Sequence, residues 1–124
     1  MNVYLFWAAS FASFVTFCVH TFIGGPRVAG PLLATRHLPP ASKWLNYYCW
    51  HIATVLLFSM SIGYGYVALH PDRPELAVFL TGLSIALSVL SAAVALKGKI
   101  NPFRFPSTSL FMTIFLLGSA ALIG

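Results

Sequence analysis

Four long apolar segments cover most of this 124-residue chain, and they constrain its fold more than any other feature. The segments span residues 2–23, 44–69, 76–96 and 107–123. An α-helix needs about 20 mainly apolar residues to cross the roughly 30 Å hydrocarbon core of a bilayer. The first three segments meet that length, and the fourth lies at the short end of the usual range. The sequence therefore predicts four transmembrane helices.

Helices are the expected form because backbone groups in lipid must form their hydrogen bonds within the protein, and the sequence lacks the strand alternation of a barrel. Hydrophobic residues make up 59% of the chain and charged residues only 7%, which is outside the range of soluble globular proteins. No linker, repeat or low-complexity tract divides the chain. We therefore expect one all-α domain over residues 1–124, a four-transmembrane-helix bundle. The first segment lacks the basic start and the cleavage site of a signal peptide, so we expect it to remain a helix.

The charges indicate how the bundle is oriented. If successive helices alternate in direction, the connections 24–43 and 97–106 lie on one side of the membrane. Short loops rich in Lys and Arg stay in the cytoplasm, so we expect these connections to be cytoplasmic and both termini to lie across the membrane. Six of the seven Lys and Arg residues lie there, as expected contacts for lipid head groups: Arg27, Arg36, Lys43, Lys97, Lys99 and Arg104. The other side has only Arg73. Nucleic-acid binding is not expected, because no soluble domain could present these cations.

Small and polar residues recur every three or four positions on three of the segments, which places them on one face of each helix. Small side chains let membrane helices approach closely, and hydroxyls bond across the contact for ~0.6 kcal/mol each. Helix packing is the interpretation that we favour, and a polar lining for a permeating substrate in an oligomer is the alternative. These seam residues are Ala9, Ser13 and Thr16 on the first segment, Thr54, Ser61 and Gly65 on the second, and Thr81, Ser84, Ser88, Ser91 and Ala95 on the third.

His20 and His51 lie within the first two predicted spans, near the cytoplasmic end of both. An ionisable side chain inside a membrane helix is a candidate functional group. Two facing imidazoles can ligate haem b iron from both sides, or supply two ligands to a copper or zinc ion. Structural hydrogen bonding is the interpretation that we favour for the two histidines, with haem or metal ligation as the first alternative and proton relay or substrate contact as the second. Cys18 and Cys49 each stand two residues before a histidine, but residues two apart on a helix point in opposite directions, so we expect free thiols there.

The carboxylates restrict the possible chemistry. Asp72 and Glu75 are the only two, and both lie in the connection on the side away from the histidines. Diiron carboxylate chemistry and a serine triad both need acids that this chain does not place near the histidines. No P-loop, dinucleotide fingerprint or zinc-protease motif is present. Enzymatic activity is therefore not expected unless a cofactor supplies it.

The connection 24–43 contains four prolines, which we expect to break any long helix: Pro26, Pro31, Pro39 and Pro40. Residues 31–38 mix leucines with a cation, as in an interfacial turn. This connection is expected to anchor the protein to anionic lipid, or to cap the histidine end of the bundle. An aromatic belt follows at the membrane entry of the second helix, formed by Trp44, Tyr47, Tyr48 and Trp50.

Short motifs in the chain resemble those of a loosely defined group of small bacterial inner-membrane proteins with four spans. The motifs are His20 with Gly24-Gly25, Pro31-Leu32-Leu33, Trp50-His51 and a proline before the last span. The resemblance extends over the whole chain. It implies the fold and a bacterial inner membrane, and it brings no established activity.

Three functional classes are compatible with these features. The first is an accessory or structural subunit of a membrane complex, bound to a larger membrane protein or to further copies of itself. The second is a haem or metal protein that uses His20 and His51. The third is a small oligomeric transporter or channel. We predict the first, because the chain is small, lacks a soluble domain and is nearly devoid of acids.

Overall fold

The computed structural model describes all 124 residues and contains no strand. Four helices are long and apolar enough to cross a membrane: Val3–Ala34, Pro40–Leu69, Pro74–Lys97 and Pro106–Ile123. The predicted all-α fold with four membrane-spanning helices is therefore confirmed. Since its apolar helices imply contact with lipid, the chain is an integral membrane protein.

The first helix is longer than predicted and changes its geometry along its length. It consists of α1 (Val3–Cys18), the π-helix η1 (Val19–Ala29) and the short α2 (Gly30–Ala34). The prediction that it ends at residue 23 is wrong, and Pro26 and Pro31 do not break it as predicted, whereas Pro39 and Pro40 do lie at a helix boundary. In an α-helix, a proline ring collides with the carbonyl four residues earlier. A π-helix bonds to the fifth residue back, so Pro26 lies inside η1 without ending the helix.

The second helix, α3 (Pro40–Leu69), begins four residues earlier than predicted, with Pro40 in its first turn, where proline is tolerated. The connection before it therefore spans only residues 35–39, and Lys43 lies on the helix rather than in a loop. The third and fourth membrane helices also begin at prolines, as α4 (Pro74–Lys97) and α5 (Pro106–Ile123). A single turn of 3₁₀-helix, η2 (Pro102–Arg104), connects them.

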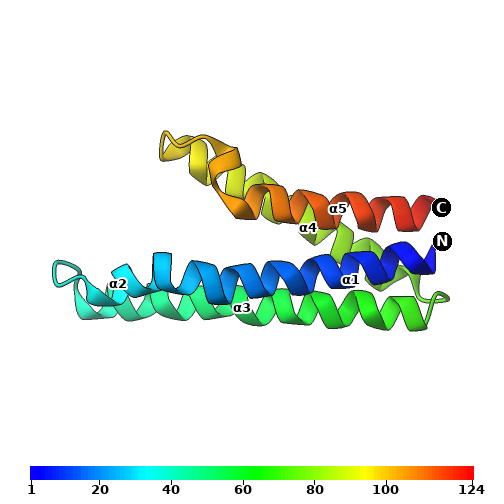
Figure 1. Cartoon of the computed structure of the whole chain (residues 1–124), viewed down its shortest axis with the longest axis horizontal. Coiled ribbons are helices and arrows are strands. Elements are labelled where there is room, and N and C mark those ends of the chain that lie inside the picture. Colours follow the sequence, from blue (N-terminus) through cyan, green and yellow to red (C-terminus); the bar gives the residue numbers. More distant parts are fainter.

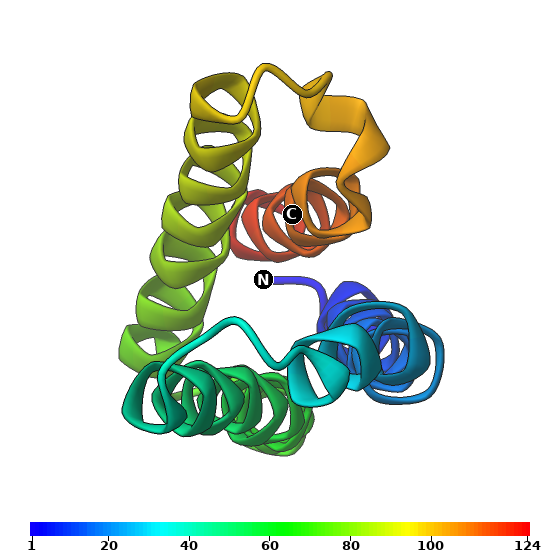
Figure 2. The same ribbon diagram turned by 90° about the vertical axis from the view of Figure 1, so that its left-hand side faces the viewer.

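The helices form two antiparallel hairpins (Figure 1). The first pairs α1, η1 and α2 with α3, and the second pairs α4 with α5. Figures 1 and 2 show the hairpins together at the end that holds both termini, and apart at the opposite end. Both basic connections, before α3 and before α5, lie at the separated end (Figure 1). The structure thus places the two basic connections on the same side of the bundle.

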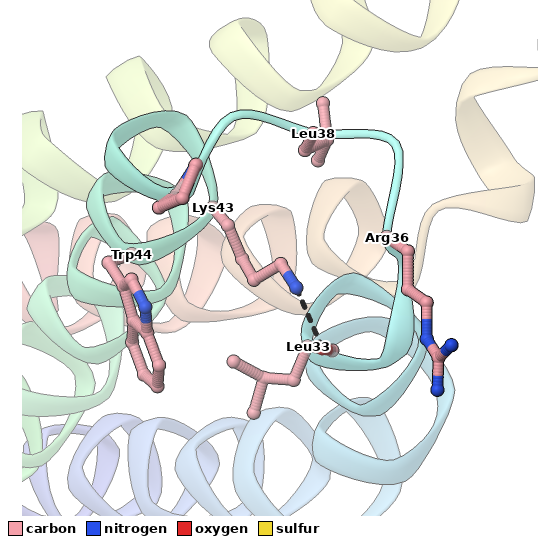
Figure 3. A pocket seen from close by; sticks show the side chains of 6 residues that line it. Leu33, Arg36, Leu38, Lys43 and Trp44 are labelled. Atoms are coloured by element: carbon pink, nitrogen blue, oxygen red, sulfur yellow. Dashed lines mark hydrogen bonds between the residues drawn. The ribbon is translucent and has the colours of Figure 1, made fainter.

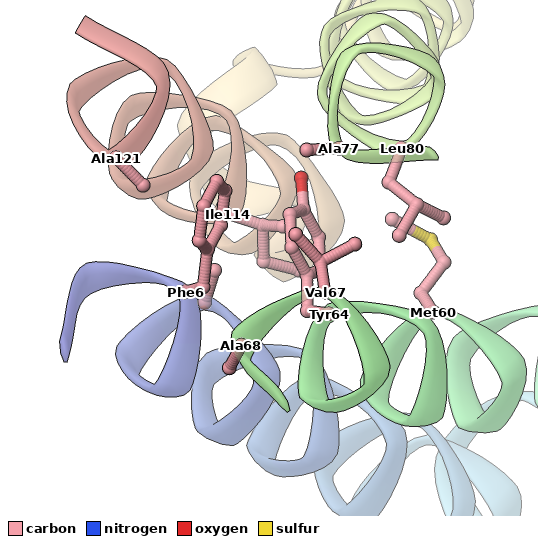
Figure 4. Packing of buried hydrophobic residues seen from close by; sticks show 10 residues of the cluster. Phe6, Met60, Tyr64, Val67, Ala68, Ala77, Leu80, Ile114 and Ala121 are labelled. Atoms are coloured by element: carbon pink, nitrogen blue, oxygen red, sulfur yellow. The ribbon is translucent and has the colours of Figure 1, made fainter. Parts of the chain in front are cut away.

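The hydrophobic core joins the hairpins at the end that holds the termini (Figure 4). Its largest side chain is Tyr64, which is fully buried and whose hydroxyl lies 3.2 Å from Thr81 Oγ1. Gly118 of α5 leaves room for this pair, since a Cβ atom there would lie 2.7 Å from Tyr64 Oη. The other core residues are Phe6, Ala9, Met60, Val67, Ala68, Ala77, Leu80, Ile114 and Ala121.

The predicted seams occupy helix contacts, but the three helices use them differently. On α1 and α4 the seam is mostly buried: Ala9, Ser13, Thr16, Thr81, Ser84, Ser88 and Ala95 are buried and Ser91 is half-buried. On α3 the three seam residues, Thr54, Ser61 and Gly65, are only half-buried. The buried face of α3 consists instead of larger residues, Leu57, Met60, Tyr64, Val67 and Ala68. The α3 seam faces α1, where Gly65 lies beside Ser10 and Trp7.

Candidate functional site

His20 joins the first helix to α3 at the separated end of the bundle. Its Nε2 atom lies 3.1 Å from the Trp50 carbonyl oxygen and 3.2 Å from Thr54 Oγ1. Because a carbonyl only accepts hydrogen bonds, Nε2 is the protonated ring nitrogen in this arrangement. The imidazole also stacks on the Trp50 indole, with ring centroids 3.9 Å apart and planes 19° apart. His20 is therefore a half-buried polar link between two helices.

Gly24 lets the π-helix approach the same tryptophan. A Cβ atom at Gly24 would lie 2.9 Å from Trp50 Cη2 and 3.2 Å from Cζ2, which is closer than Cβ atoms pack. The indole is thus in contact with His20 and with the backbone of Gly24. These contacts hold η1 to α3 at Trp50.

His51 has different surroundings. Its side chain is exposed, and its ring meets Tyr47 edge-on, with centroids 4.6 Å apart and planes 86° apart. Haem ligation by two histidines needs both imidazoles aimed at one iron from opposite faces. His20 instead directs Nε2 at α3 itself and has one face covered by Trp50. The arrangement of the two histidines therefore does not fit a haem between them.

The two histidines are not joined by further residues that could serve as metal ligands. No three or more His, Cys, Asp or Glu residues are grouped so that they could hold an ion. Cys18 is half-buried and Cys49 is exposed, and both are free thiols. Asp72 lies in the turn before α4 and Glu75 in the first turn of α4, at the other end of the bundle. Asp72 pairs there with Arg73 at 3.6 Å, with both side chains exposed.

A pocket of about 330 Å³ lies between the first helix and α3. The π-helix forms one wall with Thr21, Gly25, Pro26 and Ala29, and α2 adds Gly30 and Leu33. The opposite wall consists of Tyr47, Trp50, His51 and Thr54 of α3. The hydroxyl of Thr21 is buried and has no hydrogen-bond partner. At Gly25 an added Cβ atom would meet nothing within 4 Å, so this position opens onto free space.

A second pocket, of about 450 Å³, adjoins the first, because Leu33 borders both. Lys43 extends across it from α3, and its Nζ donates a hydrogen bond of 3.2 Å to the Leu33 carbonyl oxygen (Figure 3). Arg36 also borders this pocket, but its guanidinium points away to the far side of α2 (Figure 3). The apolar wall is formed by Leu33, Leu38, Pro40 and Trp44.

The remaining predicted head-group cations are exposed around the same end of the molecule. Arg27 lies on η1, Lys97 ends α4, and Arg104 ends η2. Lys99 has a positive φ of 55° in the turn after α4. The separated end of the bundle thus carries six cations and no carboxylate.

Several structural residues were not singled out from the sequence. Ser10, Thr21, Tyr64, Thr108 and Gly118 all take part in helix contacts or line the pocket. Thr108 and Gly118 could have been recognised from the sequence, because the buried positions of α5 recur at spacings of six, four and three. These positions are Thr108, Ile114, Gly118 and Ala121. Nothing in the local sequence marks Ser10 or Thr21 apart from other hydroxyls.

The two pockets at this end offer an ammonium group, an imidazole, hydroxyls and aromatic faces. No protein-family model, curated protein or solved structure matches the chain.

Proposed function

We propose that this chain is a non-catalytic accessory subunit of a membrane complex, in a bacterial inner membrane with its basic connections in the cytoplasm. One observation supports this function above the others. Every hydroxyl of the predicted seams has a hydrogen-bond partner within the chain. Side chains that are engaged in this way serve packing rather than the passage of a substrate.

The hydrogen bonds are of two kinds. Ser13, Thr16 and Ser84 donate to carbonyls one turn back on their own helices. Others cross between helices, as where Ser88 donates to the Thr108 carbonyl at 2.9 Å and Ser91 lies 2.7 Å from Ser107 Oγ. Because these hydroxyls already have partners, they are not free to solvate a permeating solute, which argues against a channel lined by the seams of a single chain.

The arrangement of the hairpins supports a partner protein. They share a core only at the end that holds the termini, and toward the basic end they diverge (Figure 1). The outer surface is apolar and rich in large side chains, with Tyr4 85% and Phe11 68% exposed. Such a surface suits contact with lipid and with other membrane helices alike. We do not propose the haem alternative, because His20 is already engaged with α3.

Photo-crosslinking in native membranes tests the proposal. A photoreactive phenylalanine analogue would replace exposed apolar residues in turn, including Phe11, with the fully buried Phe6 as the matched control. The expected result is a heavier adduct with one protein species from a contiguous set of exposed positions, and none from Phe6. An adduct of twice the chain mass would identify a second copy as the partner. Crosslinks to lipid alone at every position would contradict the proposal.

A further inference from the structure

We propose that the basic end of the first hairpin is a discrete binding site for one anionic phospholipid. The lipid phosphate lies at Lys43, and its glycerol ester groups lie between η1 and α3. This site does not depend on a partner protein, so it is tested on the purified chain.

The cation at the site is held in place and is not neutralised. Lys43 is half-buried, and its ammonium group donates to the Leu33 carbonyl across the pocket. An ammonium group has three N–H donors, so two remain for an acceptor in the pocket. Arg36 borders the same pocket, but its guanidinium points away from it, so Lys43 is the cation that faces the pocket (Figure 3). No carboxylate lies at this end of the bundle, and a phosphate is the complementary charge at the level of the head groups.

The two pockets follow the order of groups along a phospholipid. Lys43 stands near the start of α3, and Tyr47 and Thr54 follow four and eleven residues later. At ~1.5 Å per residue, the pocket between η1 and α3 therefore lies roughly 6 to 16 Å deeper than the ammonium group. In a lipid, the ester carbonyls lie deeper than the phosphate and accept hydrogen bonds. The deeper pocket presents donors of the matching kind.

Thr21 is the most specific of these donors. Its hydroxyl is buried, borders the deeper pocket and lacks a partner within the protein, although buried polar atoms in proteins are nearly always paired. An ester carbonyl in the pocket would accept its hydrogen. His51 lines the same space from α3, as does Thr54, whose hydroxyl already donates to the Trp50 carbonyl.

The π-helix provides the room. Gly25 faces open space, where a side chain would meet nothing within 4 Å. A large residue at this position would thus fill the pocket without displacing protein atoms. Gly82 on α4 is equally free of neighbours and is exposed, so it is the matched control for the same substitution.

Native mass spectrometry of the detergent-purified chain, titrated with phosphatidylglycerol or phosphatidylethanolamine, tests the site. The wild-type chain is expected to retain one phosphatidylglycerol in preference to phosphatidylethanolamine. Lys43→Ala should weaken this binding about tenfold, and Thr21→Val about threefold, as expected for the loss of a charged and of a neutral hydrogen bond. Gly25→Leu should abolish it, whereas Lys97→Ala and Gly82→Leu should bind as the wild type does.

Three results would overturn the proposal. The first is equal retention of the two lipids by the wild type, and the second is equal weakening by Lys43→Ala and Lys97→Ala. The third is unchanged binding in Gly25→Leu, which also serves as the test if Lys43→Ala does not fold. A competition experiment with excess inorganic phosphate distinguishes a lipid site from a site for free phosphate. If the phosphate displaced phosphatidylglycerol completely, the site would be one for free phosphate and not for a lipid.

Discussion

Ser10 and Ser61 exchange hydrogen bonds across the contact between α1 and α3. The Ser10 hydroxyl donates to the Ser61 carbonyl at 2.7 Å, and the Ser61 hydroxyl donates to the Ser10 carbonyl at 3.0 Å. Because each bond uses separate atoms, we expect Ser10→Ala and Ser61→Ala to destabilise the fold by ~0.6 kcal/mol each, and the double variant by about the sum. Denaturant unfolding in mixed micelles measures these differences.

Ser59 is the control for that pair. It lies on the same helix, is exposed, and makes no hydrogen bond through its side chain within the chain. Ser59→Ala should therefore leave the free energy of unfolding unchanged. If the double variant were no less stable than Ser59→Ala, the exchange between Ser10 and Ser61 would have no energetic role.

A methyl group at Gly118 should destabilise the core. It would press on the buried hydroxyls of Tyr64 and Thr81, which have little space to retreat. We expect Gly118→Ala to cost about 1–3 kcal/mol, the usual range for an overpacked core. Gly82→Ala, in open space, should cost nothing. Combining Gly118→Ala with Tyr64→Phe removes one of the crowded oxygens and should restore part of the loss in the same unfolding assay.

Substitutions at the two histidines should have unequal effects. His20→Phe keeps an aromatic ring against Trp50 but removes the hydrogen bond to the Trp50 carbonyl, so we expect a loss of about 1 kcal/mol in stability. His51→Phe removes an exposed imidazole that makes no hydrogen bond within the chain, and should change stability little. Equal losses from both substitutions would show instead that the histidines act as a pair.

Adjacent glycines in η1 provide a test of the π-helix packing. An alanine at Gly24 would collide with the Trp50 indole, whereas an alanine at Gly25 would meet nothing within 4 Å. We expect Gly24→Ala to shift Trp50 away from His20 and to lower stability, with Gly25→Ala close to the wild type. Fluorescence of a variant that retains Trp50 as its only tryptophan reports the movement. Identical spectra for the two alanine variants would contradict this packing.

The sequence was sufficient to predict the number of membrane helices and the faces on which α1 and α4 pack. Hydropathy and the spacing of small residues determine both, and these are properties of short windows of sequence. The end of the first helix could not be predicted in this way. Pro26 stops an α-helix, and only the packing of His20 and Gly24 of η1 against Trp50 of α3 reveals that the backbone widens instead of ending.

The candidate site was predictable only in part. The position of His20 and His51 near one end of neighbouring helices follows from sequence counting, but the direction of each imidazole depends on tertiary contacts. The role of Lys43 was hidden for a related reason. The sequence predicted that Lys43 lies in a loop, but it lies on the first turn of α3, where its side chain reaches the carbonyl of Leu33.

The unequal charge of the two ends of the bundle has an electrical consequence. Six cations lie at the separated end, while Arg73 lies with Asp72 and Glu75 at the other. Moving one elementary charge across an energised membrane against the potential costs roughly 2.3 kcal/mol per 100 mV. With the basic end on the negative side, inverting the chain at a potential of about 100 mV would thus cost about 14 kcal/mol for those six charges. The membrane potential would then oppose inversion of this protein in the membrane.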